Sequence, residues 1–338
     1  MGKKRKKGKT SGSRRLARKL GVGLLVVLGL WGAVGVWFAH HPKSWIDAQP
    51  RPLSAALLYL GNPLGDVTDA FGLTGYDTVC EYDTEAPDGS VLFAGAPVRV
   101  SSPAPSDIRV LDRGEFLIGW SDRLRHPVWC AYHVKRAATH ENAKRPGFTK
   151  DKSLANSPAP ADYTKSGYDR GHMVPNYAIV TRYGEAAQKM TFLMSNVTPQ
   201  SPALNRGVWR EVEHRIADLW TARYGEIWVV VGCISPDANR ETLSGTGIDV
   251  PTDYYQIVIA QEGMDVRALA VCFRQDVGWD AWPTRYLTTI RELEERTGLN
   301  FNPELPDFFA RQLEGDLPTR LWPIRPLDIF KQIALRFM

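Results

Sequence analysis

The chain has 338 residues, of which 43% are hydrophobic and 23% are charged. This balance is typical of globular proteins and excludes a disordered, collagen-like or coiled-coil chain. The net charge of +5 is unevenly distributed, because residues 1–19 hold ten Lys or Arg and no acid, which leaves 32 basic against 37 acidic residues elsewhere. A uniformly basic nucleic-acid coat is therefore excluded, and any polyanion site must be a local basic patch.

The first predicted element is a membrane-spanning helix at residues 20–40. The twenty residues from Leu20 to Ala39 carry no charge, which is about the length that a helix needs to cross a bilayer. The basic residues 1–19 predict a cytoplasmic tail and an extracytoplasmic remainder. A cleaved signal peptide is the alternative, but its apolar run is usually only ~7–15 residues, and Trp37 would be too bulky for a cleavage site after Ala39. We therefore expect an uncleaved, single-pass signal-anchor.

Three sections follow the predicted span. They are a linker rich in Pro, Gly and Asp at 41–90, a folded domain at 91–312 and a C-terminal extension at 313–338 that ends in an amphipathic basic segment. Short runs rich in Val, Ile and aromatic residues predict strands at 91–100, 115–121, 127–135, 227–235, 254–261 and 266–273. Helical patterns appear at 209–224 and at 284–297, the latter closed by Gly298. Antiparallel strands with a few helices predict an α+β domain.

Four cysteines lie in these sections, and four allow three complete disulfide pairings. Cys130, Cys233 and Cys272 each sit inside an apolar, strand-like run, whereas Cys80 lies in the linker. Free cysteines are among the most buried residue types. The sequence therefore favours small buried thiols over disulfides, and the spacing of the four does not match a zinc site.

The first chemically distinctive motif is Asp169-Arg170-Gly171-His172. Arg170 offers a planar fork of donors suited to a phosphate, and His172 titrates near neutrality and can accept a proton from water. On an extended strand, residues two apart point to the same face. We therefore expect Arg170 and His172 to share a phosphate site. The alternative is a salt-bridged strand end at the surface.

The second motif begins with a predicted strand at 191–197 that carries Asn196 and continues into a helix starting near Asn205. An amide oxygen with few carboxylates suits Mg²⁺ that keeps most of its waters. Glu213 follows eight residues later, on a similar face but ~12 Å along the axis. Glu213 is therefore expected not to bind the metal directly but to contact a water molecule bound to the metal. The alternatives are a helix N-cap for Asn205 and a solvated helix face for Glu213.

Together the two motifs resemble those of the DNA/RNA non-specific endonuclease family. The resemblance covers about residues 91–310 and includes the expected opening strands at 114–134, Arg145–Phe148, Ala161–Thr164, Pro251–Val258 and Tyr286–Leu305. It implies the ββα-metal nuclease fold, in which two strands and a helix clamp one divalent ion. In that fold His172 would be the general base, and Asn205 the sole direct protein ligand of Mg²⁺, with Mn²⁺ as an alternative.

The resemblance also implies roles for other residues. Glu213 would tune the hydrated metal, Arg170 and Arg145 would bind phosphate, and Asn196 would support the site. Arg145 is the least secure match, because three lysines lie nearby at 144, 150 and 152.

The leading functional interpretation is a membrane-tethered, Mg²⁺-dependent endonuclease. It would cut DNA and RNA without sequence preference, and the resemblance implies 5′-phosphate products. One alternative is a catalytically silent module that captures nucleic acid at the cell surface. Another is a phosphodiesterase acting on a different phosphodiester. The intact set of motif residues favours the nuclease over the silent module, and the dense resemblance outside the site favours it over the other phosphodiesterase. The sequence leaves the oligomeric state open.

Overall fold

The computed structural model describes residues 77–82, 90–236 and 240–328, all within one compact unit at 69–338. The expected basic tail at 1–19, the membrane span at 20–40 and the amphipathic segment at 329–337 lie outside the described residues. Within the described ranges, no helix is both long and apolar enough to cross a membrane.

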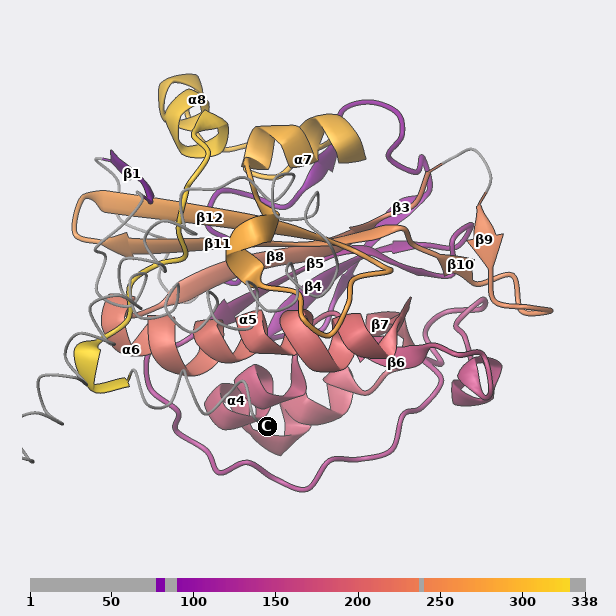
Figure 1. The fold of residues 1–338 in the computed structure, drawn as a ribbon. Coiled ribbons are helices and arrows are strands. Elements are labelled where there is room, and N and C mark those ends of the chain that lie inside the picture. Colours follow the sequence, from indigo (N-terminus) through magenta and orange to yellow (C-terminus); the bar gives the residue numbers. More distant parts are fainter. Residues whose placement is uncertain (1–76, 83–89, 237–239, 329–338) are drawn as a thin grey trace, which may run out of the picture. The chain divides into compact units, whose positions relative to one another are not determined.

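An antiparallel sheet lies at the centre of the fold (Figure 1). Its strands follow the order β1-β12-β11-β8-β5-β4-β3, and β13 pairs with β12 beside this path. Every residue of β5 is buried, as expected for a central strand covered on both faces. The strands are β1 (Thr78–Glu81), β3 (Ile108–Asp112), β4 (Phe116–Ser121), β5 (His126–Val134), β8 (Ile227–Ile234), β11 (Asp253–Glu262), β12 (Asp265–Arg274) and β13 (Leu287–Thr288).

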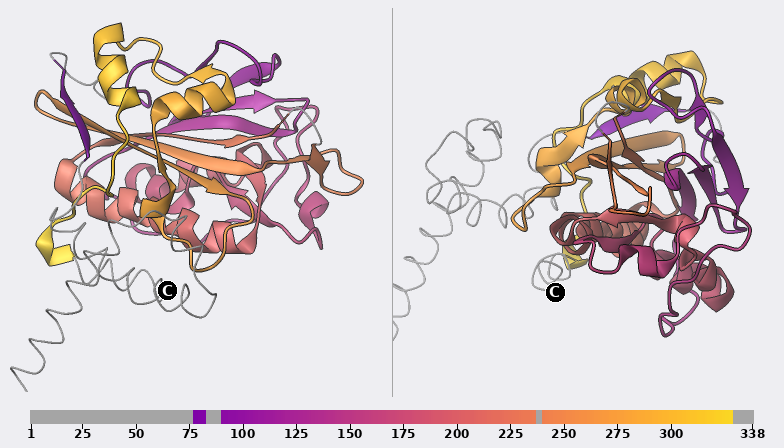
Figure 2. Two further views of the ribbon diagram at one scale, coloured as in Figure 1. Left: turned by 45° about the horizontal axis from the view of Figure 1, so that its top comes forward. Right: turned by 90° about the vertical axis from the view of Figure 1, so that its right-hand side faces the viewer.

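Helices cover both faces of the sheet (Figures 1 and 2). One face carries α4 (Asn176–Thr191) and a long helical segment formed by η3 (Leu204–Trp209), α5 (Arg210–His214), η4 (Arg215–Trp220) and α6 (Thr221–Tyr224), in which η3 and η4 are π-helical. The other face carries α7 (Ile290–Thr297) and α8 (Asp307–Gly315). Each helical layer packs on its own apolar core, so the sheet is buried from both sides.

Three short two-stranded antiparallel ladders lie outside the central sheet. They are β6 (Asp169–His172) with β7 (Val197–Gln200), β9 (Glu241–Thr242) with β10 (Asp249–Val250), and β2 (Val98–Arg99) with β14 (Leu299–Asn300). The remaining turns are 3₁₀ helices η1 (Pro160–Tyr163), η2 (Met194–Asn196), η5 (Pro283–Tyr286) and η6 (Pro326–Asp328). The β6–β7 ladder leads directly into η3, and this connection shapes the site described below.

The predicted α+β class with an antiparallel sheet is confirmed, but three elements differ from expectation. Only Val98–Arg99 of the strand expected at 91–100 is extended. The strand expected at 191–197 is wrong, because η2 precedes a strand that begins at Val197. The helix expected from residue 284 begins at Ile290, where the Thr289 hydroxyl caps it by accepting from Glu292 N.

Both ends of the described region extend the domain expected at 91–312. Strand β1 adds an edge to the sheet beside β12. The segment after α8 returns to the core, where Leu321, Trp322 and Ile324 are buried and Trp220 Nε1 donates to Trp322 O at 3.0 Å. Residues of the linker and of the C-terminal extension therefore take part in the fold.

The four cysteines are free thiols, in agreement with the sequence. Cys80, Cys130 and Cys233 are buried, and Cys272 is partly exposed. Cys272 Sγ accepts a hydrogen bond from Arg296 Nη1 at 3.1 Å.

Candidate active site

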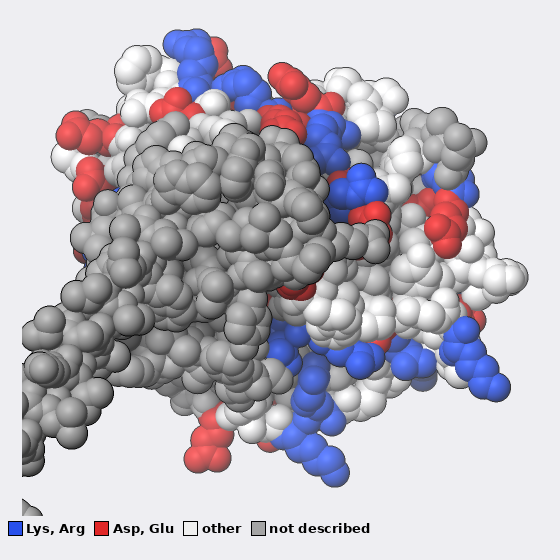
Figure 3. Space-filling model, viewed as in Figure 1, with Lys and Arg blue, Asp and Glu red and all other residues white. Residues whose placement is uncertain are grey.

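A cleft of about 640 Å³ opens where α4, η3 and α5 meet the segment before β6. Four cationic side chains line it together with polar groups. Figure 3 shows Lys and Arg along the lower part of the molecule, over the layer of α4 and α5, with few acidic side chains among them, whereas Lys and Arg at the top are mixed with Asp and Glu. The cations of the cleft form a local basic patch, the kind of surface that a polyanion site needs in a chain of this charge distribution. The lining includes Lys144, Arg145, His172, Asn176, Asn205, Arg206, Arg210, Glu213 and His214.

The β6–β7 ladder positions His172. His172 pairs with Val197, and Gly171 pairs with Thr198. A Cβ on Gly171 would lie 2.2 Å from the Oε1 of buried Gln200, so only glycine allows the two strands to approach this closely. The strand predicted for this motif is therefore confirmed, and Gly171 fixes how His172 enters the cleft.

His172 packs against two aromatic rings that also contact each other, and it is only 9% exposed. Its ring centroid is 5.0 Å from that of Phe148 and 4.7 Å from that of Phe192. Burial, assisted by the charge of Arg145, lowers the pKa of His172 to about 3. The imidazole is therefore neutral at physiological pH. Among the described residues its buried Nε2 has no hydrogen-bond partner, so the lone pair of this nitrogen is unshared, while the same burial makes the imidazole a weak base in this structure.

Asn205 does not cap the helix, so the cap interpretation is wrong. The N-cap residue is Ala203, and Asn205 lies inside η3. Its Nδ2 donates to Asp169 Oδ2 at 2.9 Å, and Arg206 Nε donates to the same oxygen at 2.7 Å. We call this pair of hydrogen bonds to Asp169 the clamp. It engages the amide nitrogen of Asn205 and leaves Asn205 Oδ1 for a ligand in the cleft.

The clamp stabilises the ionised form of the Asp169 carboxylate. Burial raises the pKa of Asp169, but hydrogen bonds from Arg206 and Asn205 outweigh burial and lower that pKa below its ordinary value. Asp169 is therefore ionised at neutral pH and accepts both bonds. A carboxylate that orients a neutral ligand is a common outer-shell arrangement at metal sites.

The residues present fit one hydrated divalent cation. Within the described part of the chain there is no group of three or more His, Cys, Asp or Glu that could hold a metal. A single oriented amide oxygen beside a carboxylate suits Mg²⁺, which binds few protein ligands and retains its waters. Asn205 would supply the direct ligand, as the sequence suggests.

Glu213 lines the same cleft and is half-buried rather than on a fully solvated face. Its Oε1 accepts from Trp209 Nε1 at 2.9 Å, one helical turn away. Burial raises the pKa of Glu213 to about 8, against the lowering effects of the Trp209 hydrogen bond and of Arg145 and Arg210. Glu213 is thus a carboxyl group held in place by an indole and facing positive charge.

The two arginines expected to bind phosphate occupy different places. Arg145 lies in the cleft with its guanidinium 5.7 Å from the Phe192 ring centre. Arg170 does not line the cleft. Its Nε and Nη2 donate to Pro160 O at 3.0 and 2.6 Å, and Nη2 also donates to Thr164 Oγ1. Arg170 therefore ties β6 to η1, and the expected sharing of one site with His172 is not seen.

Asn196 supports the site through hydrogen bonds to the backbone at Val174 and Thr191. It is fully buried, its Oδ1 accepts from Val174 N at 2.9 Å, and its Nδ2 donates to Val174 O and Thr191 O, both at 3.0 Å. These bonds fix the turn between His172 and α4. Asn196 is thus a positioning residue, in line with the supporting role suggested by the resemblance.

Sequence reasoning missed several cleft residues, among them Arg210, Asn176 and His214. Arg210 lies three residues before Glu213, and side chains three apart share a helix face, so helical spacing could have found it. Asn176 opens α4, which has no regular apolar period because Gly184 interrupts it with a φ of +81°. No signal in the sequence marked that position.

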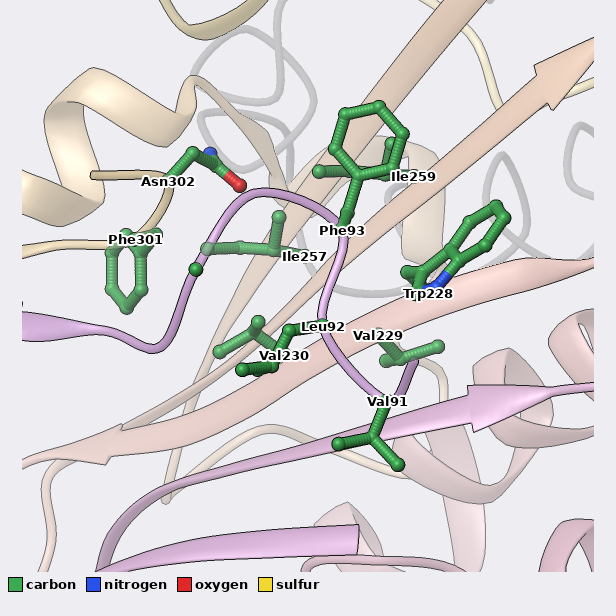
Figure 4. Close-up of a pocket in the computed structure, with 11 residues that line it drawn as sticks. Val91, Leu92, Phe93, Trp228, Val229, Val230, Ile257, Ile259, Phe301 and Asn302 are labelled. Atoms are coloured by element: carbon green, nitrogen blue, oxygen red, sulfur yellow. The ribbon is translucent and has the colours of Figure 1, made fainter. Parts of the chain in front are cut away.

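A second hollow lies on the other side of the sheet (Figure 4). Its side chains are almost all apolar, among them Val91, Phe93, Trp228, Ile257 and Phe301. With a volume of about 10 Å³, it has room for about one water molecule. It belongs to the packing of that core and is not a ligand site.

Comparison with known proteins agrees with this geometry. The chain is 31% identical over 209 residues to the mitochondrial nuclease EXOG of Xenopus laevis, covering 56% of each chain. It is 24% identical over 300 residues to mitochondrial endonuclease G of Bos taurus, covering 83% of this chain and 94% of that one. A nuclease of Serratia marcescens is 29% identical over 197 residues, covering 55% and 72%. The chain thus spans just over half the length of EXOG.

A solved structure shares the fold. It is a complex of EndoG with EndoGI, described as showing the mechanism of EndoG inhibition, with a TM-score of 0.54 and 22% identity over 60% of this chain and 88% of that chain. The family model for DNA/RNA non-specific endonucleases matches residues 94–308, which include the whole cleft. The chain therefore belongs to the DNA/RNA non-specific endonuclease family.

Proposed function

We propose that the chain hydrolyses phosphodiester bonds of both DNA and RNA in the cleft around His172. The observation that carries this proposal is the neutral imidazole of His172, whose buried Nε2 lacks a partner among the described residues, in a cleft lined by Lys and Arg. Contacts to phosphate carry no sequence information, so we expect little sequence preference.

His172 would act as the general base. As a water oxygen bonds to phosphorus, a proton of that water passes to the imidazole. The bond from phosphorus to the 3′ oxygen breaks, and the 3′ oxygen takes a proton from solvent, which leaves a 5′-phosphate end and a 3′-hydroxyl. General bases contribute ~10²–10⁴ in rate. Burial is the main cause of the low His172 pKa, and the charge of Arg145 lowers that pKa further. A phosphate bound beside Arg145 would offset this second contribution, so substrate binding would make the base stronger.

Asn205 would hold Mg²⁺, or Mn²⁺, through its Oδ1, and Glu213 would act on the hydrated ion without binding it directly. When bound, such a cation stabilises negative charge that develops on phosphoryl oxygens. Arg145 and Arg210 would hold the same phosphate by charge-assisted hydrogen bonds. The clamp of Asp169 on Asn205 supports this assignment.

A cleavage assay tests the proposal. The full-length protein is incubated with plasmid DNA and with RNA, with Mg²⁺, without added metal, and with excess chelator. We expect cleavage of both polymers with Mg²⁺, 5′-phosphate ends, and loss of cleavage with chelator. Retention of both polymers without cleavage would instead support a silent binding module. Cleavage of a small phosphodiester alone would support the third alternative.

We also propose that residues 20–40 anchor the protein with the nuclease domain outside the cytoplasm. This rests on the uncharged segment Leu20–Ala39 and the basic residues before it. The full-length protein should stay in the membrane fraction after a high-salt wash, and protease added from outside should digest the portion after residue 40. A soluble product that begins near residue 40 would show a cleaved signal peptide instead.

A further inference from the structure

The loop after β12 is fastened to the helix that carries Asn205. At its start, Gln275 Oε1 accepts from Ser201 N at 2.9 Å, and Gln275 Nε2 donates to Pro199 O at 2.8 Å. At the end of the loop, Trp282 is buried, and the guanidinium carbon of Arg215 lies over its ring, 5.8 Å from the ring centre. The loop is therefore held at both ends along the segment from β7 to η4.

Between these anchors the loop exposes a tryptophan. Trp279 is 67% exposed, although a large aromatic ring gains free energy when it leaves water. The nearest atom to a Cβ placed on Gly207 is Trp279 Cε3, at 3.9 Å. Gly207 lies two residues beyond Asn205 and next to Arg206, whose side chain is 60% exposed and lines the cleft. The indole thus lies against the helical segment that carries Asn205 and Arg206, next to the residue that follows Arg206.

We propose that Trp279 is a stacking platform for an unpaired base of the nucleic acid whose backbone occupies the cleft. The proposal rests on the proposed nuclease function and narrows its substrate to nucleic acid with a single-stranded segment beside the cleaved bond. Sites for single strands combine cations that follow the backbone with aromatic rings on which bases stack. Arg206 and Trp279 supply this pair. In a duplex the base faces are already stacked, so the indole would gain less there.

Kinetics of the full-length protein on a single-stranded oligonucleotide and on the matched duplex test this inference. Stacking contributes ~1–3 kcal/mol per base, so Trp279→Ala should raise KM for the single strand about tenfold. We expect kcat to change little and the duplex KM to rise much less. Trp279→Phe keeps a ring and should restore most of the affinity. Phe308→Ala is the matched control, because Phe308 is also 67% exposed but lies on α8, on the other face of the sheet.

A binding measurement covers the case in which cleavage itself fails. Oligo(dT) should quench the tryptophan fluorescence of the wild type more than that of Trp279→Phe, with or without turnover. Equal quenching, or a Trp279→Ala variant that keeps the wild-type KM for the single strand, would overturn the inference. Equal losses on single strand and duplex would also overturn it, because the ring would then not read unpaired bases. Wild-type protein that binds oligo(dT) through Trp279 but cuts nothing would refute the nuclease proposal alone.

Discussion

Replacing His172 with Ala should lower the rate of plasmid cleavage by at least about a hundredfold while the protein stays folded. The variant loses the only group in our mechanism that takes the proton from water. Because His172 packs against both Phe148 and Phe192, the truncation also leaves a small cavity. We expect that cavity to lower the melting temperature modestly, since the removed side chain is polar and its Nε2 has no partner among the described residues.

The measurement is kcat under saturating Mg²⁺, with the melting temperature of the same preparation. His214→Ala is the control, since it removes the other imidazole that lines the cleft, and it should reduce kcat less than tenfold. A folded His172→Ala protein with wild-type turnover would refute the mechanism. A larger loss of kcat in His214→Ala than in His172→Ala would show that the general base is not His172.

Replacing Asn205 with Ala should raise the Mg²⁺ concentration for half-maximal activity at least about tenfold, because the direct ligand is lost. Asp169→Ala should produce a shift of about 10–100-fold as well, since changes in partners that orient a ligand typically have this effect. Asn205→Asp is a third case. It keeps a ligand oxygen, loses the donor to Asp169 and brings two carboxylates together, so its melting temperature should fall without Mg²⁺ and recover when Mg²⁺ is added.

Mg²⁺ titrations of cleavage and of melting temperature on these variants give the answer. Asn142→Ala is the matched control, because Asn142 also lines the cleft but has no part in the clamp. It should leave the Mg²⁺ requirement unchanged. An Asn205→Ala protein with the wild-type Mg²⁺ requirement would place the metal on another residue.

Much of this fold could be predicted because its main strands are apolar and rich in β-branched and aromatic residues. The runs that became β4, β5, β8, β11 and β12 are of this kind. The helix α4 was missed because Gly184 breaks its regularity. Residues 191–197 were mistaken for a strand because their apolar side chains also suit a buried turn, and periodicity alone cannot separate the two in so short a run.

The site shows a similar division. Placement of His172 on a strand and of Asn205 on the following helix could be predicted, because each depends on local sequence. The hydrogen bond from Asn205 to Asp169 joins residues 36 positions apart in the sequence. The hydrogen bond from Arg170 to Pro160 O, which keeps Arg170 out of the cleft, depends on where η1 packs. Such contacts are set by tertiary packing, and one sequence without relatives contains no signal for them.

The most direct test of the metal assignment is a crystal of the His172→Ala protein soaked in Mn²⁺, with an anomalous difference map. Ions of this class bind oxygen ligands at about 2.1 Å. We predict one peak at that distance from Asn205 Oδ1, with no second protein atom bonded to the ion and Glu213 reaching it only through water. A peak bonded to other side chains, with Asn205 still turned only toward Asp169, would contradict the central claim that this amide holds the catalytic metal.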